Sequence, residues 1–277
     1  MSRSQPAGAP LLRVDGVTVR FGGITAVDDV SFDVSEGELL GLIGPNGAGK
    51  TTLMRAIIGV VPPTLGSVEL DGESLNGLPT HKRIQRGLSL SQQLVKPLME
   101  MNIAENVALA AGSAKTVHPL RSMLHVSSVD ELAVAQRELQ RVGIAGIADQ
   151  SPRIQPLGVL KRLELARALA LRPRLLLLDE PLAGLNSKEA RALATTIAEI
   201  NGQGLTIVLI EHNLGEVMRI CRRLVVLDNG RNIGDGEPRS VMADPVVRAA
   251  YLGGDALGAA SSEVRSTYTP PSDSRHA

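Results

Sequence analysis

Apolar and polar residues alternate in three short runs near the start of the chain. The apolar positions of these runs are Val17 and Val19, then Val30, Phe32 and Val34, and then Val68 and Leu70. Alternation gives a strand one face for the core and one for solvent, and the Gly and Asp residues between the runs suit antiparallel strands. The pattern therefore predicts an antiparallel β subdomain near the N-terminus.

Four later stretches are apolar without alternation. They are ELLGLIG (38–44), LLLLDE (175–180), TIVLIE (206–211) and LVVLD (224–228). Continuous apolar strands are typical of a sheet that is covered on both faces. Helical patterns separate these stretches, and the helix that contains TTLMRAIIGV is expected to stop at Pro62 and Pro63. The arrangement predicts an α/β fold in which helices flank a parallel sheet.

Helical stretches dominate residues 85–165, and we expect no buried strand among them. One helix is expected to begin at a capping box of Ser128 and Glu131, ahead of LAVAQRELQRVGI. We therefore expect a helical lobe inserted in a single domain that spans residues 11–255.

The two ends of the chain have a different composition from this domain. Residues 1–10 and 256–277 are rich in Ser, Pro, Ala and Gly and have no periodicity. Such segments bury too little apolar surface to fold, so both are expected to be disordered tails.

Composition and charge narrow the class of protein. Hydrophobic residues make up 43% of the 277 residues, which is enough for a sizeable core. The 29 basic and 29 acidic residues cancel and no dense basic stripe occurs, so we expect no nucleic-acid partner. No apolar run reaches the roughly 18–20 residues that span a bilayer, and the N-terminus lacks a signal-peptide core, so a cytosolic chain is expected. Cys221, the single cysteine, is expected to be a small buried hydrophobe.

A glycine-rich stretch, GPNGAGKTT (44–52), lies between the first apolar strand and the helix that follows it. It fits the phosphate-loop pattern G-x-x-x-x-G-K-[ST] in the strand–loop–helix setting that the chemistry needs. The glycines let backbone N–H groups converge on phosphate oxygens at the helix N-terminus. Lys50 is expected to reach the β- and γ-phosphates of ATP, and Thr51 to ligate Mg²⁺; the alternative is a turn without a ligand. The expected ATP contacts are Gly44, Pro45, Asn46, Gly47, Ala48, Gly49, Lys50, Thr51 and Thr52.

Two adjacent acids end the apolar stretch LLLLDE. Asp179 stands where a carboxylate is wanted for Mg²⁺, directly or through a bound water, and Glu180 where a general base would polarise the attacking water. The alternative is that both acids cap the next helix. A phosphate loop in the same chain favours the catalytic interpretation.

The order of these motifs resembles an ATP-binding cassette (ABC) subunit of a membrane transporter, over about residues 11–254. Among such subunits the chain is most similar to the nucleotide-binding subunits of high-affinity branched-chain amino acid importers. The motifs that carry the resemblance are RFGGITAVDDVSF, GLIGPNGAGKTTL, EMNIAENV, KRLELARALA, LDEPLAGLN, IEHNLGEVM and AYLG. The resemblance implies a P-loop NTPase fold with a parallel-sheet core, an N-terminal antiparallel β subdomain and an inserted α-helical lobe, and hydrolysis of ATP with Mg²⁺.

The resemblance also assigns roles to residues outside the phosphate loop. Phe21 matches the aromatic side chain that stacks on adenine, with packing in the core as the alternative. Gln93 matches the glutamine that senses Mg²⁺ and the attacking water, although Gln92 is adjacent and either could be a surface amide. His212 matches the histidine that contacts the γ-phosphate, and Asn186 lies in the loop that crosses to a second cassette.

The family's signature segment, L-S-G-G-Q, is altered here. Gln155, Pro156, Leu157, Gly158 and Val159 take its positions, and Gly158 alone is retained. Pro156 offers no hydroxyl to the γ-phosphate and Val159 offers no amide; each lost contact is worth roughly 1–3 kcal/mol, or about tenfold in rate per 1.4 kcal/mol. Because the signature acts on the ATP of the partner cassette, we expect an asymmetric heterodimer, with a homodimer as the alternative.

The resemblance implies further partners at the cytoplasmic face of the inner membrane. Two transmembrane permease subunits would dock in a groove near Gln93, where VKPLMEM (95–101) offers an apolar surface; the alternative is that this segment packs within its own lobe. An extracytoplasmic solute-binding protein would deliver branched-chain amino acids or another small solute such as urea, an amide or a carboxylic acid. The alternative functions are an exporter ATPase for lipid-like cargo and a soluble ABC ATPase without a transport role.

Overall fold

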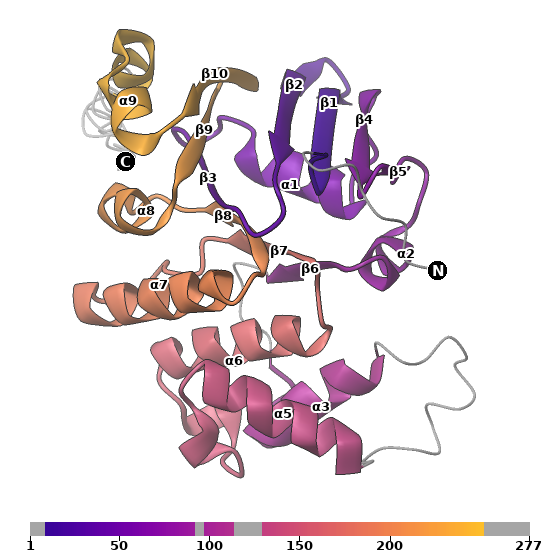
Figure 1. Cartoon of the computed structure of the whole chain (residues 1–277), viewed down its shortest axis with the longest axis vertical. Helices are drawn as coiled ribbons and strands as arrows, with labels where there is room; N and C mark the ends of the chain where they lie inside the picture. The colour runs from indigo at the N-terminus through magenta and orange to yellow at the C-terminus, as the bar shows by residue number, and fades with distance from the viewer. Residues whose placement is uncertain (1–8, 92–96, 114–128, 252–277) are drawn as a thin grey trace, which may run out of the picture.

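The structure is a computed structural model, and it describes residues 9–91, 97–113 and 129–251. Two sheets and a group of helices form its layers (Figure 1). One sheet has four strands in the order β2-β1-β4-β5, and the other has six in the order β10-β9-β3-β8-β7-β6. The expected α/β architecture is confirmed.

The four-stranded sheet is the antiparallel subdomain that the alternating runs predict. Its strands are β1 (Leu12–Phe21), β2 (Ile24–Val34), β4 (Leu65–Leu70) and β5 (Glu73–Ser74). All of the paired strands run antiparallel, and β1 lies between β2 and β4. The seven apolar positions of the alternating runs are all buried, with at most 6% of any side chain exposed.

The six-stranded sheet contains the four continuous apolar stretches as neighbours. Its strands are β3 (Leu39–Ile43), β6 (Leu88–Ser91), β7 (Leu175–Asp179), β8 (Thr206–Ile210), β9 (Arg223–Asp228) and β10 (Arg231–Gly236). Five strands pair in parallel, and β10 closes one edge antiparallel to β9. The parallel strands end at one edge of the sheet, so the residues that follow β3, β7 and β8 lie close together there.

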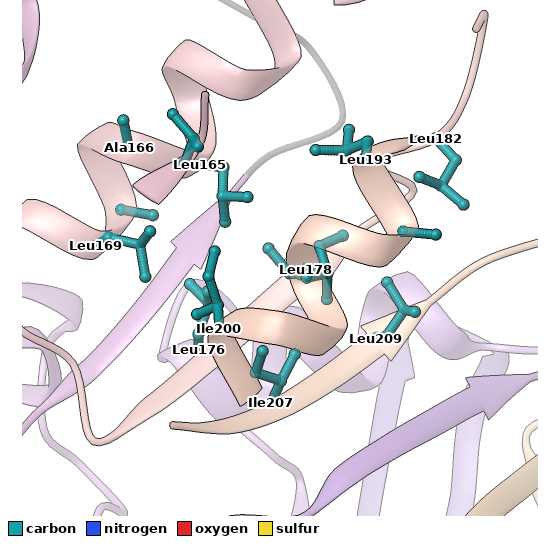
Figure 2. Packing of buried hydrophobic residues seen from close by; sticks show 14 of the residues in the cluster. Leu165, Ala166, Leu169, Leu176, Leu178, Leu182, Leu193, Ile200, Ile207 and Leu209 are labelled. Carbon is teal, nitrogen blue, oxygen red and sulfur yellow. The ribbon is translucent and has the colours of Figure 1, made fainter. Parts of the chain in front are cut away.

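The two faces of this sheet belong to different cores. Leu176 and Leu178 of β7 face helices α6 (Leu157–Ala170) and α7 (Ser187–Gly202), as Figure 2 shows. Leu175 and Leu177 point the other way, into the core shared with α1 (Lys50–Ile58) and the antiparallel sheet. Burial on both faces explains why the four strand residues before Asp179 are all apolar.

Strand β6 corrects the expectation that residues 85–165 contain no buried strand. It pairs with β7 from Leu88 to Ser91, and Ser89 is fully buried with its hydroxyl donating to the Ala168 carbonyl. The sequence LSLS is too short and too polar to stand out from the surrounding helical pattern. The β7 backbone supplies the ladder that makes it a strand.

The other described residues of that region form the expected helical lobe. Its helices are α3 (Ile103–Ser113), α5 (Val129–Arg141) and the signature-bearing α6, with short 3-10 turns η1 (Ala145–Ile147) and η2 (Pro152–Ile154). These three helices lie together below the sheets in Figure 1. Glu131 stands in the first turn of α5, whereas Ser128, its predicted capping partner, lies outside the described residues.

Helix α1 stops earlier than the two prolines suggest. It ends at Ile58 because Gly59 adopts a left-handed conformation (φ 85°), and the Gly59 N–H bonds back to the carbonyls of Arg55 and Ala56. The remaining helices are α2 (Thr80–Gln85), α8 (Leu214–Ile220) and α9 (Pro238–Ala243). None of the helices in the described ranges is long and apolar enough to cross a membrane.

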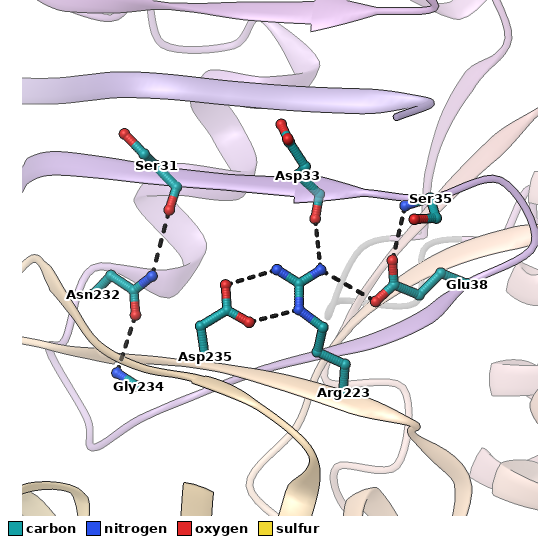
Figure 3. Close-up of polar contacts among 8 residues, drawn as sticks. All are labelled: Ser31, Asp33, Ser35, Glu38, Arg223, Asn232, Gly234 and Asp235. Carbon is teal, nitrogen blue, oxygen red and sulfur yellow. Dashed lines mark hydrogen bonds and ion pairs between the residues drawn. The ribbon is translucent and has the colours of Figure 1, made fainter. Parts of the chain in front are cut away.

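An arginine with four hydrogen bonds helps to join the two sheets. Arg223 of β9 makes two hydrogen bonds to the Asp235 carboxylate on β10, at 2.6 and 2.7 Å (Figure 3). The same guanidinium donates to the Asp33 carbonyl of β2 at 2.9 Å and to Glu38 at 3.3 Å. These bonds fix the antiparallel subdomain against the edge of the parallel sheet.

Two further expectations concern Cys221 and the ends of the chain. Cys221 is buried, and burial raises the pKa of its thiol to about 12, so it is the inert hydrophobe expected. The tail expected at residues 256–277, and all but the last two residues of the tail at 1–10, lie outside the described residues.

Candidate functional site

The glycine-rich loop runs from the end of β3 to the start of α1, as the phosphate-loop interpretation requires. Gly44 (φ 148°) and Gly49 (φ 97°) are the positions where only glycine fits. A Cβ on Gly44 would lie 2.0 Å from the Leu227 carbonyl oxygen, and one on Gly49 would lie 2.4 Å from that of Ala26. The loop is therefore pressed against β9 and β2, and the exposed Asn46 and Gly47 form its outer part.

Lys50 lies beneath this loop at the first position of α1. Its side chain is buried, and Nζ donates to the carbonyl oxygens of Gly44 and Pro45, each at 2.8 Å. Burial lowers the pKa of Lys50, while the charges of Glu180 and Asp179 oppose that shift. The ammonium thus stands between the loop and the two acids that end β7.

Asp179 is the last residue of β7. Burial raises the pKa of its carboxyl group, and the neighbouring charge of Glu180 raises it further. Its Oδ1 atom is buried and has no hydrogen-bond partner among the described residues. A buried carboxylate oxygen without a donor is costly unless a cation or a bound water satisfies it.

Glu180 has an unusual backbone as well as a chemically useful side chain. Its φ of 51° lies in the left-handed region, which costs roughly 1–3 kcal/mol for a residue other than glycine. Its N–H donates to the Ile210 carbonyl of β8 at 2.9 Å. Its carboxylate Oε1 lies 2.8 Å from Nε2 of His212, the second residue after β8. The turn after β7 therefore directs Glu180 at His212.

Glu211 is a site residue that the sequence motifs did not single out. It is buried at the end of β8, and its two oxygens accept the N–H groups of Leu182 at 2.6 Å and His212 at 3.1 Å. Burial raises the pKa of its carboxyl group, and the backbone hydrogen bonds oppose that shift. In the sequence, the only sign of this role is that Glu211 is a single acid directly after an apolar strand. Its carboxylate therefore links the segment after β7 to the segment after β8.

Tyr251 was also missed as a site residue, although it lies in the quoted motif AYLG. Its hydroxyl accepts a hydrogen bond from the backbone N–H of Gly44, and burial raises its pKa to about 12. The segment after α9 therefore contacts the first residue of the glycine-rich loop.

Phe21 ends β1 at the tip of the β1–β2 hairpin. Its ring is 51% exposed, so the alternative of packing in the core is wrong. The same hairpin carries Ala26, whose carbonyl lies against Gly49 of the loop. An exposed aromatic ring on an element that borders the loop is available to a flat ligand.

The segment at 155–159 lies at the start of α6, in the helical lobe. Pro156 is the N-cap residue, with φ −66° and no side-chain cap, and the helix begins at Leu157. The Val159 side chain packs against the core that α6 shares with β7, while the Gln155 amide donates to the Gln150 side chain at 2.9 Å. A Cβ on Gly184 would lie 2.9 Å from Leu157, so the segment borders the loop that follows Glu180.

Asn186 ends that loop and caps α7. Its side chain accepts the N–H groups of Lys188 and Glu189, and Glu189 bonds back to the Asn186 N–H, which completes a capping box. Gln93, the remaining predicted residue, lies outside the described residues. The structure thus brings Lys50, Asp179, Glu180 and His212 together, with segment 155–159 on a separate element.

Comparisons with known proteins agree on one family. The family model described as ABC transporter matches residues 27–183, and the one described as branched-chain amino acid ATP-binding cassette transporter matches residues 231–256. The high-affinity branched-chain amino acid transport ATP-binding protein BraF of Pseudomonas aeruginosa is 38% identical over 250 residues, or 88% of this chain and 98% of BraF. LivG of Escherichia coli, described in the same words, is 37% identical with the same coverage.

A solved structure supports the same assignment at the level of the fold. The crystal structure of the ADP conformation of an ATP-binding cassette from an ABC transporter superposes with a TM-score of 0.80 at 29% identity. The match covers 88% of this chain and 99% of that one.

Proposed function

The chain belongs to the ABC transporter family of ATP-binding proteins, and we propose that it energises the uptake of branched-chain amino acids or related small solutes. ATP is the nucleotide of this family, and the chain is an ATP hydrolase. The cargo is proposed because BraF and LivG are both described as high-affinity branched-chain amino acid transport proteins. The match of residues 231–256 to the branched-chain amino acid family supports import over export.

One observation carries the catalytic proposal: the hydrogen bond of 2.8 Å between Glu180 and His212, beside a buried lysine at the end of a glycine-rich loop. In this proposal Glu180 accepts the proton of the attacking water, and His212 both orients that carboxylate and faces the γ-phosphate. Lys50 exchanges its two loop carbonyls for the β- and γ-phosphates when ATP binds.

The residues at this edge also fit Mg²⁺. The buried Oδ1 of Asp179 lacks a protein donor among the described residues, and the half-buried Thr51 lies one residue after Lys50. Mg²⁺ is usually held by one or two protein oxygens together with substrate phosphates, which matches this donor set. When bound it would neutralise charge on the β- and γ-phosphates. Gln93 is proposed as a further contact.

The remaining contacts to ATP are proposed from the loop and from Phe21. The residues from Gly44 to Thr52 surround the phosphates and offer them backbone N–H groups, except at Pro45, which has none, and the exposed Phe21 ring stacks on adenine. A single domain over residues 11–255 would then contain the whole nucleotide site of this chain.

Two of the proposed partners are permease subunits. Leu98 and Met99, which are 41% and 39% exposed, offer an apolar surface beside the helical lobe. A helix of the permease is the partner that such a patch suits, and this contact would hold the chain at the cytoplasmic face of the inner membrane. A solute-binding protein outside the membrane would complete the importer.

A second cassette is the third proposed partner, and we favour one that differs from this chain. The segment Gln155–Val159 would face that partner's ATP with a proline and a valine where the family usually supplies a hydroxyl and an amide. The N–H groups of Leu157 and Gly158 remain as donors, because an α-helix does not use its first N–H groups internally, whereas those of Val159 and Leu160 bond to the Pro156 carbonyl.

The test uses the complex purified from native membranes through a tag on this chain. Glu180→Gln should lower ATP turnover at least 100-fold while the affinity for Mg-ATP stays within about threefold, because an amide cannot accept the proton. Glu36→Gln, at an exposed carboxylate before β3, is the matched control and should leave turnover unchanged. Persistence of most of the ATPase activity in Glu180→Gln would contradict the assignment.

A further inference from the structure

A buried lysine lies behind the candidate general base. Lys161 is in the second turn of α6, and only 6% of it is exposed, although lysine is rarely buried unless it is paired. Its Nζ donates to the backbone carbonyl of Glu180 at 3.2 Å. Burial lowers the pKa of Lys161, and the nearby charges of Glu211, Glu180 and Asp179 oppose that shift. The ammonium is therefore placed among the acids that end β7 and β8.

This contact completes a clamp on a strained peptide. The Glu180 N–H donates to the Ile210 carbonyl, and the Glu180 carbonyl accepts both the Ala183 N–H and Lys161 Nζ, each at 3.2 Å. Lys161 is thus the side chain that adds to the two backbone bonds and ties the residue to α6. Left-handed conformations of residues other than glycine persist only where the surroundings fix them. The direction of the Glu180 side chain toward His212 depends on this conformation, because a change of backbone φ would swing the carboxylate away.

We propose that Lys161 is a positioning residue. It holds the Glu180 backbone from α6, so the general base keeps its orientation toward His212 while α6 packs against the ends of β7 and β8. The inference rests on the proposed function, since it concerns the same hydrolytic site. Lys161 is three residues after Gly158 on the same helix, and a helix moves as a rigid rod over so short a distance. Any displacement of the segment that faces the partner's ATP is thereby transmitted to the base of this chain's own site.

The inference assigns the lysine an effect on the chemical step rather than on nucleotide affinity. Lys161→Met keeps much of the side-chain volume but removes this donor, so the left-handed Glu180 is held by its backbone bonds to Ile210 and Ala183 without the tie to α6. Lys161→Arg keeps a charged donor and should rescue part of the function. The exposed Lys82 of α2 provides the matched control, Lys82→Met.

The experiment measures kcat, KM and Mg-ATP affinity in the purified complex. Lys161→Met should lower kcat about 10- to 100-fold with Mg-ATP affinity within twofold, Lys161→Arg should recover at least a third of the lost rate, and Lys82→Met should match the wild type. In single-turnover assays, adding Lys161→Met to Glu180→Gln should cause less than a twofold further loss. That result is expected because the lysine acts through Glu180.

Three results would overturn the inference. They are an unchanged kcat in Lys161→Met, an equal loss of kcat and nucleotide affinity, and a full additional loss in the Glu180→Gln background. If Lys161→Met does not fold, Lys161→Gln, whose shorter and neutral side chain does not reach the Glu180 carbonyl, takes its place: a kcat loss of twofold or more at unchanged affinity supports the clamp, and a wild-type kcat contradicts it. Failure of the proposed function would give a different result: ATP turnover would be absent in the wild type or would persist in Glu180→Gln, and both of these proteins retain Lys161.

Discussion

Asp179 shows how the site sets function against stability. Its carboxylate is buried next to the charge of Glu180, and one oxygen has no donor among the described residues. Such a group favours the neutral form in the folded protein. A nucleotide-bound cation would reverse that preference. The buried Asp179 carboxylate therefore suits ligand binding and lowers the stability of the folded protein when no ligand is bound.

Substitution of Asp179 by Asn should therefore stabilise the chain in the absence of Mg²⁺ and nucleotide. The folded pKa of Asp179 is raised above its ordinary value of 3.8, so the folded state favours the protonated form. Wild-type stability is then fully retained below pH 3.8 and is lost as the pH rises through the raised pKa. Asn does not titrate, so Asp179→Asn should melt about 2–4 °C above wild type at pH 8.

The measurement is thermal unfolding in EDTA at several pH values between 5 and 8. The advantage of Asp179→Asn should shrink as the pH falls, whereas Asp15→Asn, at an exposed position of β1, should stay close to wild type throughout. An advantage that grows on acidification would contradict the assigned direction of the shift.

At the residue scale, the sequence predicted the side chains that come together in the candidate site better than the buried side chains that hold them in place. Lys50, Asp179, Glu180 and His212 could be predicted because glycine-rich loops and strand-terminal acids have fixed spacing along the chain. Lys161 and Glu211 could not, because their importance depends on burial. A lysine in the pattern KRLELARALA has the same appearance whether it faces solvent or the Glu180 carbonyl beyond the next strand.

At the element scale, the local pattern of apolar residues was sufficient to predict a strand wherever that strand buries at least one full apolar face. The alternating and continuous apolar runs predicted seven of the ten strands in the described residues, since burial on one or two faces leaves a direct trace in sequence, whereas β5 and β10 have no such pattern. The strand at Leu88–Ser91 was not predicted, because its extended conformation depends on pairing with β7 rather than on its own residues. Helix α1 ended at Gly59 rather than at the prolines, because a left-handed glycine cap acts before them.

Asn186 links an element's stability to a loop with a proposed role between cassettes. Its side chain accepts two N–H groups at the start of α7, so Asn186→Ala should lower the free energy of unfolding by about 1 kcal/mol. Asn186→Asp keeps the acceptor and should remain within about 0.5 kcal/mol of wild type. Chemical denaturation of both variants measures the difference.

The same pair of variants separates capping from any further role of the loop. Should Asn186→Asp keep stability yet lose ATP turnover in the assembled complex, the amide itself would matter at the contact between cassettes. Equal losses of stability in the two variants would contradict the capping box.

At the scale of the molecule, the Arg223 guanidinium is one of the contacts that connect the antiparallel subdomain to the parallel sheet. Arg223 reaches Asp235, the Asp33 carbonyl and Glu38 at once, and its side chain is 30% exposed. Lysine cannot reproduce the paired bonds to Asp235. Arg223→Lys should therefore lower the free energy of unfolding by about 1–2 kcal/mol, as measured by denaturant unfolding.

A second arginine offers a matched comparison for this contact. Arg231 of β10 pairs with Asp28 of β2 and so bridges the same two sheets, but its side chain is 72% exposed. Arg231→Lys should change stability by less than about 0.5 kcal/mol, because exposed ion pairs contribute little. Equal effects of the two substitutions would show that the geometry of the Arg223 contacts is unimportant.

The last question at this scale is which cassette completes each ATP site. In a pair of identical copies, both sites would combine this chain's glycine-rich loop with its own altered segment. In a mixed pair, the ATP on this chain's loop would meet the partner's segment instead. The chain alone should therefore hydrolyse ATP slowly, and addition of the natural partner should raise turnover by about tenfold or more, the factor expected for one or two recovered hydrogen bonds.

Val159→Gln tests the same asymmetry from within the chain. Val159 is half-buried in the first turn of α6, at the position where the family's signature segment has its glutamine. In the chain alone, the added amide should raise turnover several-fold at both sites, with Val159→Leu as the control without a donor. In the mixed pair the same change should matter less, because the faster site uses the partner's segment. A stimulation by Val159→Gln that is equally large in the mixed pair would mean that this chain's segment serves the faster site, which would contradict the proposed division of labour.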